Sequence, residues 1–293
     1  MRTIEEVTKA IVDVGLEHRL NDILALVKPS IRLRYSTTND GSAIGASRFG
    51  GLPDLPDSIE WPTWTLYRNS QADRTDKYAP PGPLYFLLQV NLADIAEFDL
   101  DPMLPKSGML YFFAAGWVNA ITYTGYENEG DLWRLIYYDG DLSDLKHQAV
   151  PKLPIELSNS ENYQMFAPTD HQFRTVGVEF DLELTLPGLT LENPFIDKLH
   201  LSEDEWDRYD SLVEGVSPLF SDAPIHRLFG HPQIGQGYFC YDDGVLVAQI
   251  DSSNYTEASN VGWEFGGRGA YFLAPPDYEK WTLSAVELYW ESY

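Results

Sequence analysis

The stretch SRFGGLPDLP at residues 47–56 decides how this chain is organised, because a second stretch, HRLFGHPQIG at 226–235, repeats its pattern. Arg48 aligns with Arg227, and both stretches then read Arg-x-x-Gly-x-Pro. Glycine permits a positive φ or the close approach of another backbone, and proline fixes an extended exit from a turn. We therefore expect the same irregular turn in two places.

Two further blocks recur in the same order. FLLQVNL at 86–92 resembles VLVAQIDS at 245–252, because apolar residues precede a glutamine and a polar residue follows two positions later. SGMLYFFAA at 107–115 matches RGAYFLAPP at 268–276, where a glycine opens an aromatic strand. Glycine and proline are common, so one block alone would mean little. Three blocks in one order predict an internal duplication.

The hydrophobic patterns around these blocks predict an α+β fold. Two capping boxes, at Thr3–Glu6 and Ser202–Glu205, each predict the start of a helix. Alternating segments such as TVGVEFDLELTL at 175–186 indicate strands. We expect one unit, 1–293, in which N-terminal helices precede an internally duplicated, mainly antiparallel β core with two pseudo-equivalent halves. Its expected parts are a helical hairpin (1–30), a first β-rich repeat (31–150), a connecting segment with an acidic helix (151–220) and a second β-rich repeat (221–293).

The charge of the chain is its most unusual bulk property. It carries 45 acidic and 20 basic residues, a net charge of −25. Such a charge disfavours binding to nucleic acids and to anionic membranes, and it favours a cationic partner. Solubility alone is the other explanation, since net charge acts on solubility and association rather than on the fold.

The chain has the features of a cytoplasmic protein. It has one cysteine, Cys240, so no disulfide can form within the chain. Its first residues are polar and amphipathic rather than those of a signal peptide. No apolar run approaches the roughly 20 residues that a membrane span needs.

Four side chains in the repeated blocks are candidates for ligand binding: Arg48, Arg227, Gln89 and Gln249. A guanidinium presents five donors in a fixed fork, and a glutamine inside an apolar strand must satisfy its amide when it is buried. One interpretation makes these residues structural tethers of a duplicated fold. The other places them at a cleft between the repeats, where they would bind an anionic or amide-bearing small ligand or a carbohydrate.

The predicted helix after Ser202 offers a different kind of site. Trp206, Tyr209 and Val213 follow helical spacing and predict an inward stripe. The acids around this stripe have two interpretations: they stabilise the positive end of the helix dipole, or they form a docking face for a basic protein. The interface candidates are Glu203, Asp204, Asp207, Asp210 and Trp206.

The blocks GGLPDLPDSIEWP, PLYFLLQVNLADI, LPKSGMLYFF, HRLFGHPQ, VAQIDSS and GRGAYFL resemble the YwqG-like family of bacterial proteins. The resemblance runs from about Arg48 to the C-terminus. It implies an α+β fold with internal duplication and no established reaction. Some members of the family occur near polymorphic-toxin genes, which implies immunity or antitoxin roles for part of it.

No motif for catalysis or for a cofactor is present. His226, His231 and Cys240 match no standard zinc spacing. The segment from Asp139 to Asp144 resembles the start of a calcium loop, but Asp144 and Val150 stand where such a loop needs glycine and glutamate, so we expect a solvated turn. A glycosidase pair is not excluded among so many acids, but nothing singles out two of them.

We therefore expect no metal, no cofactor, no nucleic acid and no membrane, and the chain is more consistent with a binding protein than with an enzyme. The leading hypothesis is a cytoplasmic inhibitor, immunity- or antitoxin-like, of a basic protein such as a toxin encoded nearby. The alternative is a module that binds a small ligand or a carbohydrate in the cleft between the repeats.

Overall fold

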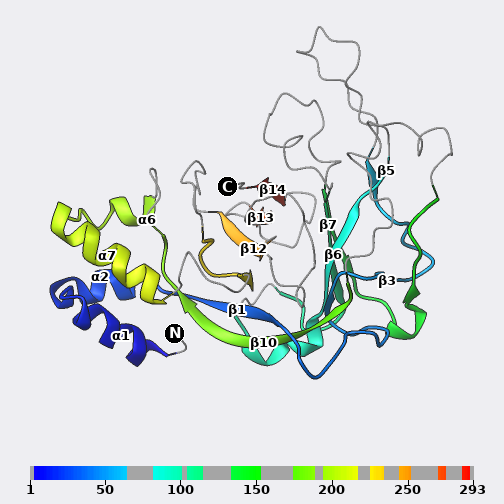
Figure 1. The fold of residues 1–293 in the computed structure, drawn as a ribbon, viewed down its shortest axis with the longest axis horizontal. Helices are drawn as coiled ribbons and strands as arrows, with labels where there is room; N and C mark the ends of the chain where they lie inside the picture. Colours follow the sequence, from blue (N-terminus) through cyan, green and yellow to red (C-terminus); the bar gives the residue numbers. More distant parts are fainter. Residues whose placement is uncertain are drawn as a thin grey trace, which may run out of the picture.

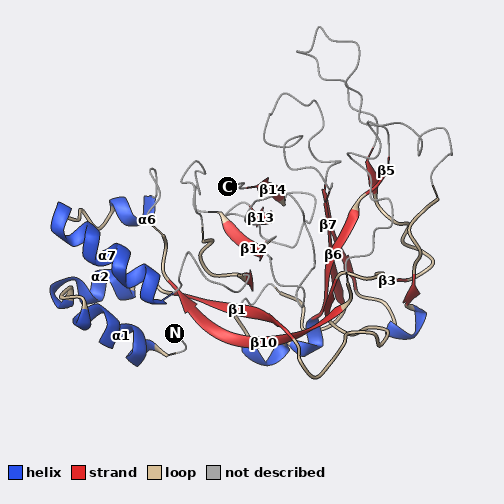
Figure 2. Cartoon of the chain, in the orientation of Figure 1, coloured by secondary structure: helices blue, strands red, loops and turns tan. Residues whose placement is uncertain are grey.

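The fold is known from a computed structural model and is shown in Figure 1. The structure describes residues 3–64, 82–100, 104–114, 133–152, 174–188, 194–216, 225–233, 244–251, 270–274 and 286–290. It is an α+β fold, in which a layer of helices lies at one end of a large curled antiparallel sheet (Figure 2).

The helical layer combines the N-terminus with a segment from the middle of the chain. Its helices are α1 (Ile4–Asp13), α2 (Leu20–Leu24), α6 (Pro194–Asp197) and α7 (Glu203–Val216), with a 3-10 turn at Glu17–Arg19 before α2. They enclose an apolar cluster that includes Val7, Ile11, Ile23, Tyr209 and Leu212. Burial of these apolar side chains stabilises the short helices, since isolated helices of such length are marginally stable in water.

Both predicted capping boxes are present. Thr3 N donates to Glu6 Oε2 and Glu6 N donates to Thr3 Oγ1, each over 3.2 Å. Ser202 N donates to Glu205 Oε2 over 2.8 Å, and Glu205 N donates to Ser202 Oγ over 3.4 Å. The predicted second helix is shorter than expected, and the first strand already begins at Lys28.

A ten-stranded sheet forms the body of the protein. Its order is β14 (Glu287–Trp290), β13 (Ala270–Ala274), β12 (Val245–Ile250), β11 (His226–Leu228), β1 (Lys28–Tyr35), β10 (Val176–Thr185), β2 (Arg48–Phe49), β6 (Tyr85–Asn91), β7 (Met109–Ala114) and β8 (Trp133–Tyr138). Two small sheets accompany it: β3 (Asp54–Leu55) pairs with β9 (Lys146–His147), and β4 (Thr63–Trp64) pairs with β5 (Gly82–Pro83). All of these pairings are antiparallel.

The long strands β1 and β10 are the centre of this order. They pair over eight positions, from Lys28 opposite Thr185 to Tyr35 opposite Val178. The alternating segment TVGVEFDLELTL, which predicts a strand, therefore forms β10. Segment 151–220, the expected connecting segment, contains β10, which pairs with β1 on one side and with β2 on the other.

The sheet curls until its two ends approach one another. Phe112 of β7 and Phe272 of β13 lie edge to face, with ring centroids 5.1 Å apart. Trp133, on the end strand β8, donates its Nε1 proton over 3.1 Å to the carbonyl oxygen of Val286, which directly precedes the other end strand, β14. One apolar core, to which both ends of the sheet contribute, lies inside the curl.

Candidate functional site

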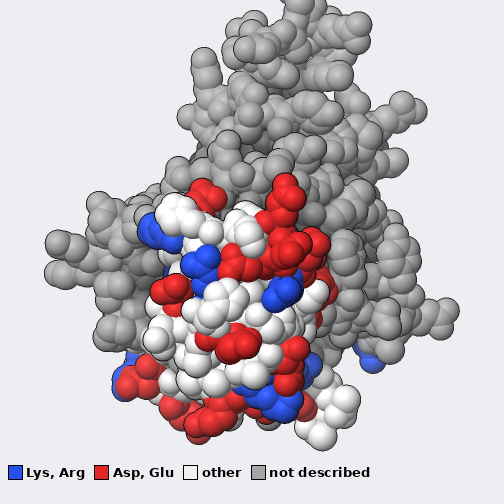
Figure 3. Space-filling model, turned by 90° about the vertical axis from the view of Figure 1, so that its left-hand side faces the viewer, with Lys and Arg blue, Asp and Glu red and all other residues white. Residues whose placement is uncertain are grey.

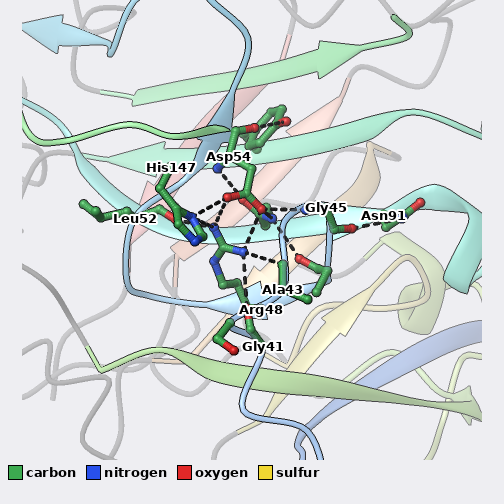
Figure 4. A network of polar contacts seen from close by, with 12 residues as sticks. Gly41, Ala43, Gly45, Arg48, Leu52, Asp54, Asn91 and His147 are labelled. Atoms are coloured by element: carbon green, nitrogen blue, oxygen red, sulfur yellow. Dashed lines mark hydrogen bonds and ion pairs between the residues drawn. The ribbon is translucent and has the colours of Figure 1, made fainter. Parts of the chain in front are cut away.

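A buried ion pair forms the centre of the first repeated turn (Figure 4). Arg48 on β2 holds Asp54 on β3 with both ends of its guanidinium: Nη2 lies 2.7 Å from Oδ1, and Nη1 lies 2.8 Å from Oδ2. The side chain of Arg48 is 1% exposed and that of Asp54 is not exposed at all. Two parallel charge-assisted bonds of this kind fix both distance and orientation.

The remaining donors of Arg48 tie the loop around it. Nη1 also donates to the carbonyl oxygens of Gly41 and Ala43, at 3.2 and 3.4 Å, and Nη2 donates to the carbonyl oxygen of Leu52. The guanidinium therefore fastens the irregular segment 41–54, which has few ladder bonds of its own. Buried backbone carbonyls need such partners.

Gln89 completes the network from the neighbouring strand β6, where it is the cross-strand partner of Arg48. Its Oε1 accepts the Asp54 N–H over 2.9 Å, and its Nε2 donates to Ala46 O and to Asp54 Oδ2, each over 2.8 Å. Gly45 N donates to Asp54 Oδ2 over 2.7 Å, and Tyr111 donates its hydroxyl proton to Asp54 O. Asp54 is thus held from every side.

The electrostatics of this network keep Asp54 ionised. Burial acts to raise the pKa of Asp54, but the hydrogen bonds and charge of Arg48 outweigh it, helped by Gln89 and Gly45. The pKa of the carboxyl group therefore lies below its ordinary value.

One group of the network reaches the surface. His147 of β9 pairs with Asp54 of β3 in the small sheet, and its Nδ1 lies 2.6 Å from Asp54 Oδ1. The side chain of His147 is 45% exposed. Neither Asp54 nor His147 was among the residues that the sequence predicted for a site. Asp54 follows the Arg-x-x-Gly-x-Pro motif directly and could have been found there, whereas His147 carries no sequence signal.

The second repeated turn has the same backbone conformation as the first. Gly51 and Gly230 have φ values of 72° and 76°, and the residues before them, Gly50 and Phe229, have 58° and 60°. Two successive positive φ values in both places explain why the motif needs its glycine, since other residues rarely adopt this conformation.

The polar contacts repeat as well. Arg227 is the cross-strand partner of Gln249, as Arg48 is of Gln89. Arg227 Nη1 donates to the carbonyl oxygen of His231, four residues on, as Arg48 does to that of Leu52. Gln249 Oε1 accepts the N–H of Gln233 over 2.9 Å, which matches the bond from Asp54 N to Gln89.

The two turns differ in the acidic residue that lies beside the arginine. Gln233 occupies the position of Asp54, and the acid beside Arg227 is instead Glu183 of β10, whose Oε1 lies 3.1 Å from Arg227 Nε. The second turn therefore takes its negative charge from a different strand.

The four ligand candidates lie in two pairs rather than in one group. β1 and β10 stand between β11 and β2, so the pairs are about three strand spacings, or about 14 Å, apart along the sheet. Arg48, Gln89, Arg227 and Gln249 are each at most 1% exposed. Their described contacts run largely to the backbone, which agrees with the interpretation of them as structural tethers.

The two histidines of the second turn are buried and neutral. Burial, followed by the charge of Arg32, lowers the pKa of His226 to about 3, and burial with the charge of Lys28 does the same for His231. His226 Nδ1 accepts the N–H of Asp251 over 3.0 Å, and His231 Nε2 lies 2.7 Å from the carbonyl oxygen of Leu26. Both rings therefore serve as backbone tethers.

No group of three or more His, Cys, Asp or Glu in the described part of the chain could hold a metal ion. Cys240 lies outside the described residues. The Asp139–Asp144 segment is a turn in which Asp141 caps a short 3-10 helix through Ser143 N, at 2.8 Å.

The acidic helix α7 divides its acids between the surface and the interior. Glu203, Asp204, Asp207 and Asp210 are exposed, and Trp206 is partly buried against the helical cluster. Glu205 points inward, where Arg19 Nε donates to its Oε1 over 2.9 Å and His18 Nε2 lies 2.7 Å from the same atom. The hydrogen bond from Arg19, then those from Ser202 and His18, hold the pKa of Glu205 far below its ordinary value. On this end of the molecule, acidic side chains lie among a smaller number of basic ones (Figure 3).

Within the described ranges, no helix is both long and apolar enough to cross a membrane. A comparison with curated proteins finds none that matches this chain. A comparison with protein families finds a match over residues 47–291, a range that contains both repeated turns. By that match the chain belongs to the family described as a domain of unknown function, DUF1963.

Proposed function

We propose that this protein is a non-enzymatic cytoplasmic binding protein that inhibits a basic protein partner, in the manner of an immunity protein or an antitoxin. The observation that carries the proposal is the net charge of −25, together with four exposed acids on one helix. A surface of this sign attracts a basic partner over long range and raises the rate of encounter.

The contacts of the polar core support a role as a scaffold. The motif side chains Arg48, Gln89 and Gln249 and the histidines of the second turn direct their described bonds largely at the backbone. Groups that already hold the fold together are poor candidates for substrate chemistry, because any rearrangement would leave buried polar atoms without partners.

The face of α7 is the surface that we propose for docking. Glu203, Asp204, Asp207 and Asp210 would pair with cations on the partner and imitate the phosphates of its natural substrate. Trp206 lies among them and is only partly buried, and aromatic side chains at interfaces set the lifetime of many complexes.

No observation on the described residues favours the alternative, a ligand cleft between the repeats. Arg48, Gln89, Arg227 and Gln249 are buried, and they lie as two separate pairs along the sheet.

We infer further that the chain arose by internal duplication and is YwqG-like. The order of strands supports this inference, because β11, β12, β13 and β14 follow β1 on one side as β2, β6, β7 and β8 follow β10 on the other. The β6–β7 and β12–β13 pairs also shift register at matching positions, between Phe86 and Leu88 and between Leu246 and Ala248.

The test is a pull-down with the protein encoded by the neighbouring gene, at low and high salt. We expect a tight complex that weakens with salt and suppresses the toxicity of the partner. Replacing the α7 acids (E203Q/D204N/D207N/D210N) should slow association. A variant with four exposed acids removed elsewhere (D40N/D57N/D139N/D144N) controls for net charge, because it changes the total by the same amount.

If both variants slow association equally, the charge acts as a whole and α7 is not the interface. If no complex forms at any salt concentration, the proposed partner is wrong.

A further inference from the structure

His231 joins the second repeated turn to the helical layer. Its Nε2 lies 2.7 Å from the carbonyl oxygen of Leu26, two residues after the end of α2. Its ring meets the ring of Phe195 on α6 edge to face, with the ring centroids 5.4 Å apart. The main chain of the same residue is fixed to the sheet, because His231 N donates to Thr185 Oγ1 of β10 over 2.9 Å. This residue therefore connects the sheet with two segments of the helical layer.

The bond to Leu26 fixes the protonation of the ring. A carbonyl oxygen can only accept, so the proton of the neutral ring lies on Nε2, and Nδ1 keeps a lone pair. Nδ1 of His231 is buried, and none of the described residues forms a hydrogen bond with it. The residue as a whole is 1% exposed. A second proton, which would have to bind at Nδ1, would therefore be buried without an acceptor among these residues.

Cations from three elements lie around this ring. Lys28 of β1 and Lys198 of α6 both lie over the ring of Phe195, with Nζ 4.7 and 5.7 Å from its centroid. Arg227 of β11 donates from Nη1 to the carbonyl oxygen of His231 over 2.9 Å. A positive charge on the His231 ring would therefore be placed near other positive charges.

The acids of the surrounding elements do not offset these cations at His231. Glu183 of β10 is engaged by Arg227, whose Nε lies 3.1 Å from Glu183 Oε1. Asp22 of α2 and Asp197 of α6 are exposed to solvent. The charges that act on the pKa of His231 are positive, and each of them lowers it.

The burial and the charges together keep the His231 ring neutral. Burial lowers the pKa of His231 most, and the charges of Lys28 and Arg227 lower it further, whereas the bond to Leu26 acts in the opposite direction. The result is a pKa of about 3, against about 6.5 for an exposed histidine. The ring can therefore take up a proton near pH 6 only when it leaves its place between Leu26 and Phe195.

We propose that His231 is a pH switch: when its ring takes up a proton, the second turn separates from α6 and from the end of α2 while the sheet stays folded. In the closed arrangement the new proton would be buried without an acceptor, whereas in the open arrangement water hydrates the charged ring. Acid therefore favours the open arrangement, because a group that binds protons in only one of two states shifts the equilibrium toward that state. The switch needs no partner protein and is independent of the docking function proposed for α7.

His226 is the internal comparison. It is also 1% exposed, and burial lowers its pKa to the same value of about 3. Both of its nitrogens are engaged, however, because Nδ1 accepts the N–H of Asp251 over 3.0 Å and Nε2 lies 2.9 Å from the hydroxyl oxygen of Tyr35. His226 belongs to β11, which lies between β1 and β12. Its ring can reach water only when the sheet itself opens, so it contributes to global stability rather than to a local switch.

Native-state hydrogen exchange of the folded full-length protein at pH 7.5 and 5.5 tests the proposal. The exchange rate of each amide is corrected for its intrinsic dependence on pH, so that the ratio of open to closed molecules remains. Local opening at His231 exposes one titrating ring, and this ratio should rise about tenfold in peptides from residues 194–199 and 229–233. Global unfolding exposes His226 as well, so the amides of the β1–β10 ladder should respond about a hundredfold, starting from a much slower rate.

The native protein alone can overturn the proposal. If the amides of 194–199 and 229–233 exchange at the same rate as the β1–β10 ladder and share its response to acid, no local opening exists. If their corrected exchange does not change between pH 7.5 and 5.5, the opening does not expose His231.

The variant His231→Gln identifies the titrating group. Glutamine does not titrate, and its amide can still donate to the carbonyl oxygen of Leu26. We expect this variant to lose the tenfold response at 194–199 and 229–233, while the ladder keeps the smaller response that His226 causes. His18→Gln is the matched control, because it removes a histidine of the helical layer that is 56% exposed, and it should keep the native response. A tenfold response that persists in His231→Gln would show that another group drives the opening.

Discussion

Replacing Asp54 by asparagine should destabilise the protein far more than one ordinary substitution does. The amide keeps the shape of the carboxylate but removes its charge, and it turns an NH₂ group toward donors of Arg48, Gln89 or His147. Breaking one partner out of a buried ion pair costs about 3–5 kcal/mol, because the other charge remains buried without compensation. The arginine here is 1% exposed, so water cannot take the place of Asp54.

Equilibrium unfolding in urea measures this cost, and the chain contains its own control. Arg34 and Asp181 form a pair of the same residue types, with Nε 2.9 Å from Oδ2, but their side chains are 52% and 31% exposed. D181N should cost at most about 1 kcal/mol, as surface pairs do. A D54N cost no greater than that of D181N would refute the claim that the buried pair fastens the 41–54 loop.

A double-mutant cycle with R48M identifies the source of the loss. If the cost comes from an uncompensated charge, the double variant R48M/D54N should be more stable than the sum of the single effects predicts, by about 1–3 kcal/mol. Additive effects would mean that the two residues act separately.

Three further predictions concern the rest of the fold. Replacing Gly230 by alanine should lower the free energy of unfolding in urea by more than about 1–2 kcal/mol, because φ is 76° and the new Cβ would lie 2.7 Å from Ser30 Cβ. The control Gly188→Ala should leave the stability nearly unchanged, because no atom lies within 4 Å of the new Cβ. The free energy of unfolding should fall by about 2–3 kcal/mol between pH 7.5 and 5.5. His226 and His231 have pKa values of about 3 in the folded protein and about 6.5 in the unfolded chain, so only the unfolded chain binds protons over this range. A free energy of unfolding that does not change with pH would show that these rings are not buried and neutral. Replacing Trp133 by phenylalanine should remove the hydrogen bond between the two ends of the sheet, lower stability by about 1 kcal/mol and speed amide exchange in β14 more than in β6.

Local sequence patterns predicted those parts of the fold that depend on neighbouring residues. The capping boxes at Thr3 and Ser202 are satisfied within four residues, and the alternation at 176–185 produces a strand. The order of the sheet was beyond such reasoning. Nothing within residues 151–220 says that β10 pairs with β1 on one side and with β2 on the other, since that choice depends on long-range burial.

The residues of the candidate site also fall into those that the sequence could identify and those that it could not. The repeated motif identified Arg48 and Gln89, because a guanidinium and an amide inside apolar strands must find partners. It could not identify His147, whose importance comes from one contact with a residue far away in the chain. Glu205 was found through its capping box, but its inward contacts with Arg19 and His18 depend on how α7 packs against the N-terminal turn.

The two turns have the same backbone conformation, but their arginines have different acidic partners. Each turn needs a negative charge near its arginine, because a buried guanidinium without one is costly. In the first turn the acid is the residue directly after the motif, Asp54, which lies on β3 opposite His147. In the second turn Glu183 supplies the charge from β10, and the residue directly after the motif is the uncharged Gln233. The position after the motif proline therefore decides whether the arginine finds its negative charge within its own turn or on a neighbouring strand.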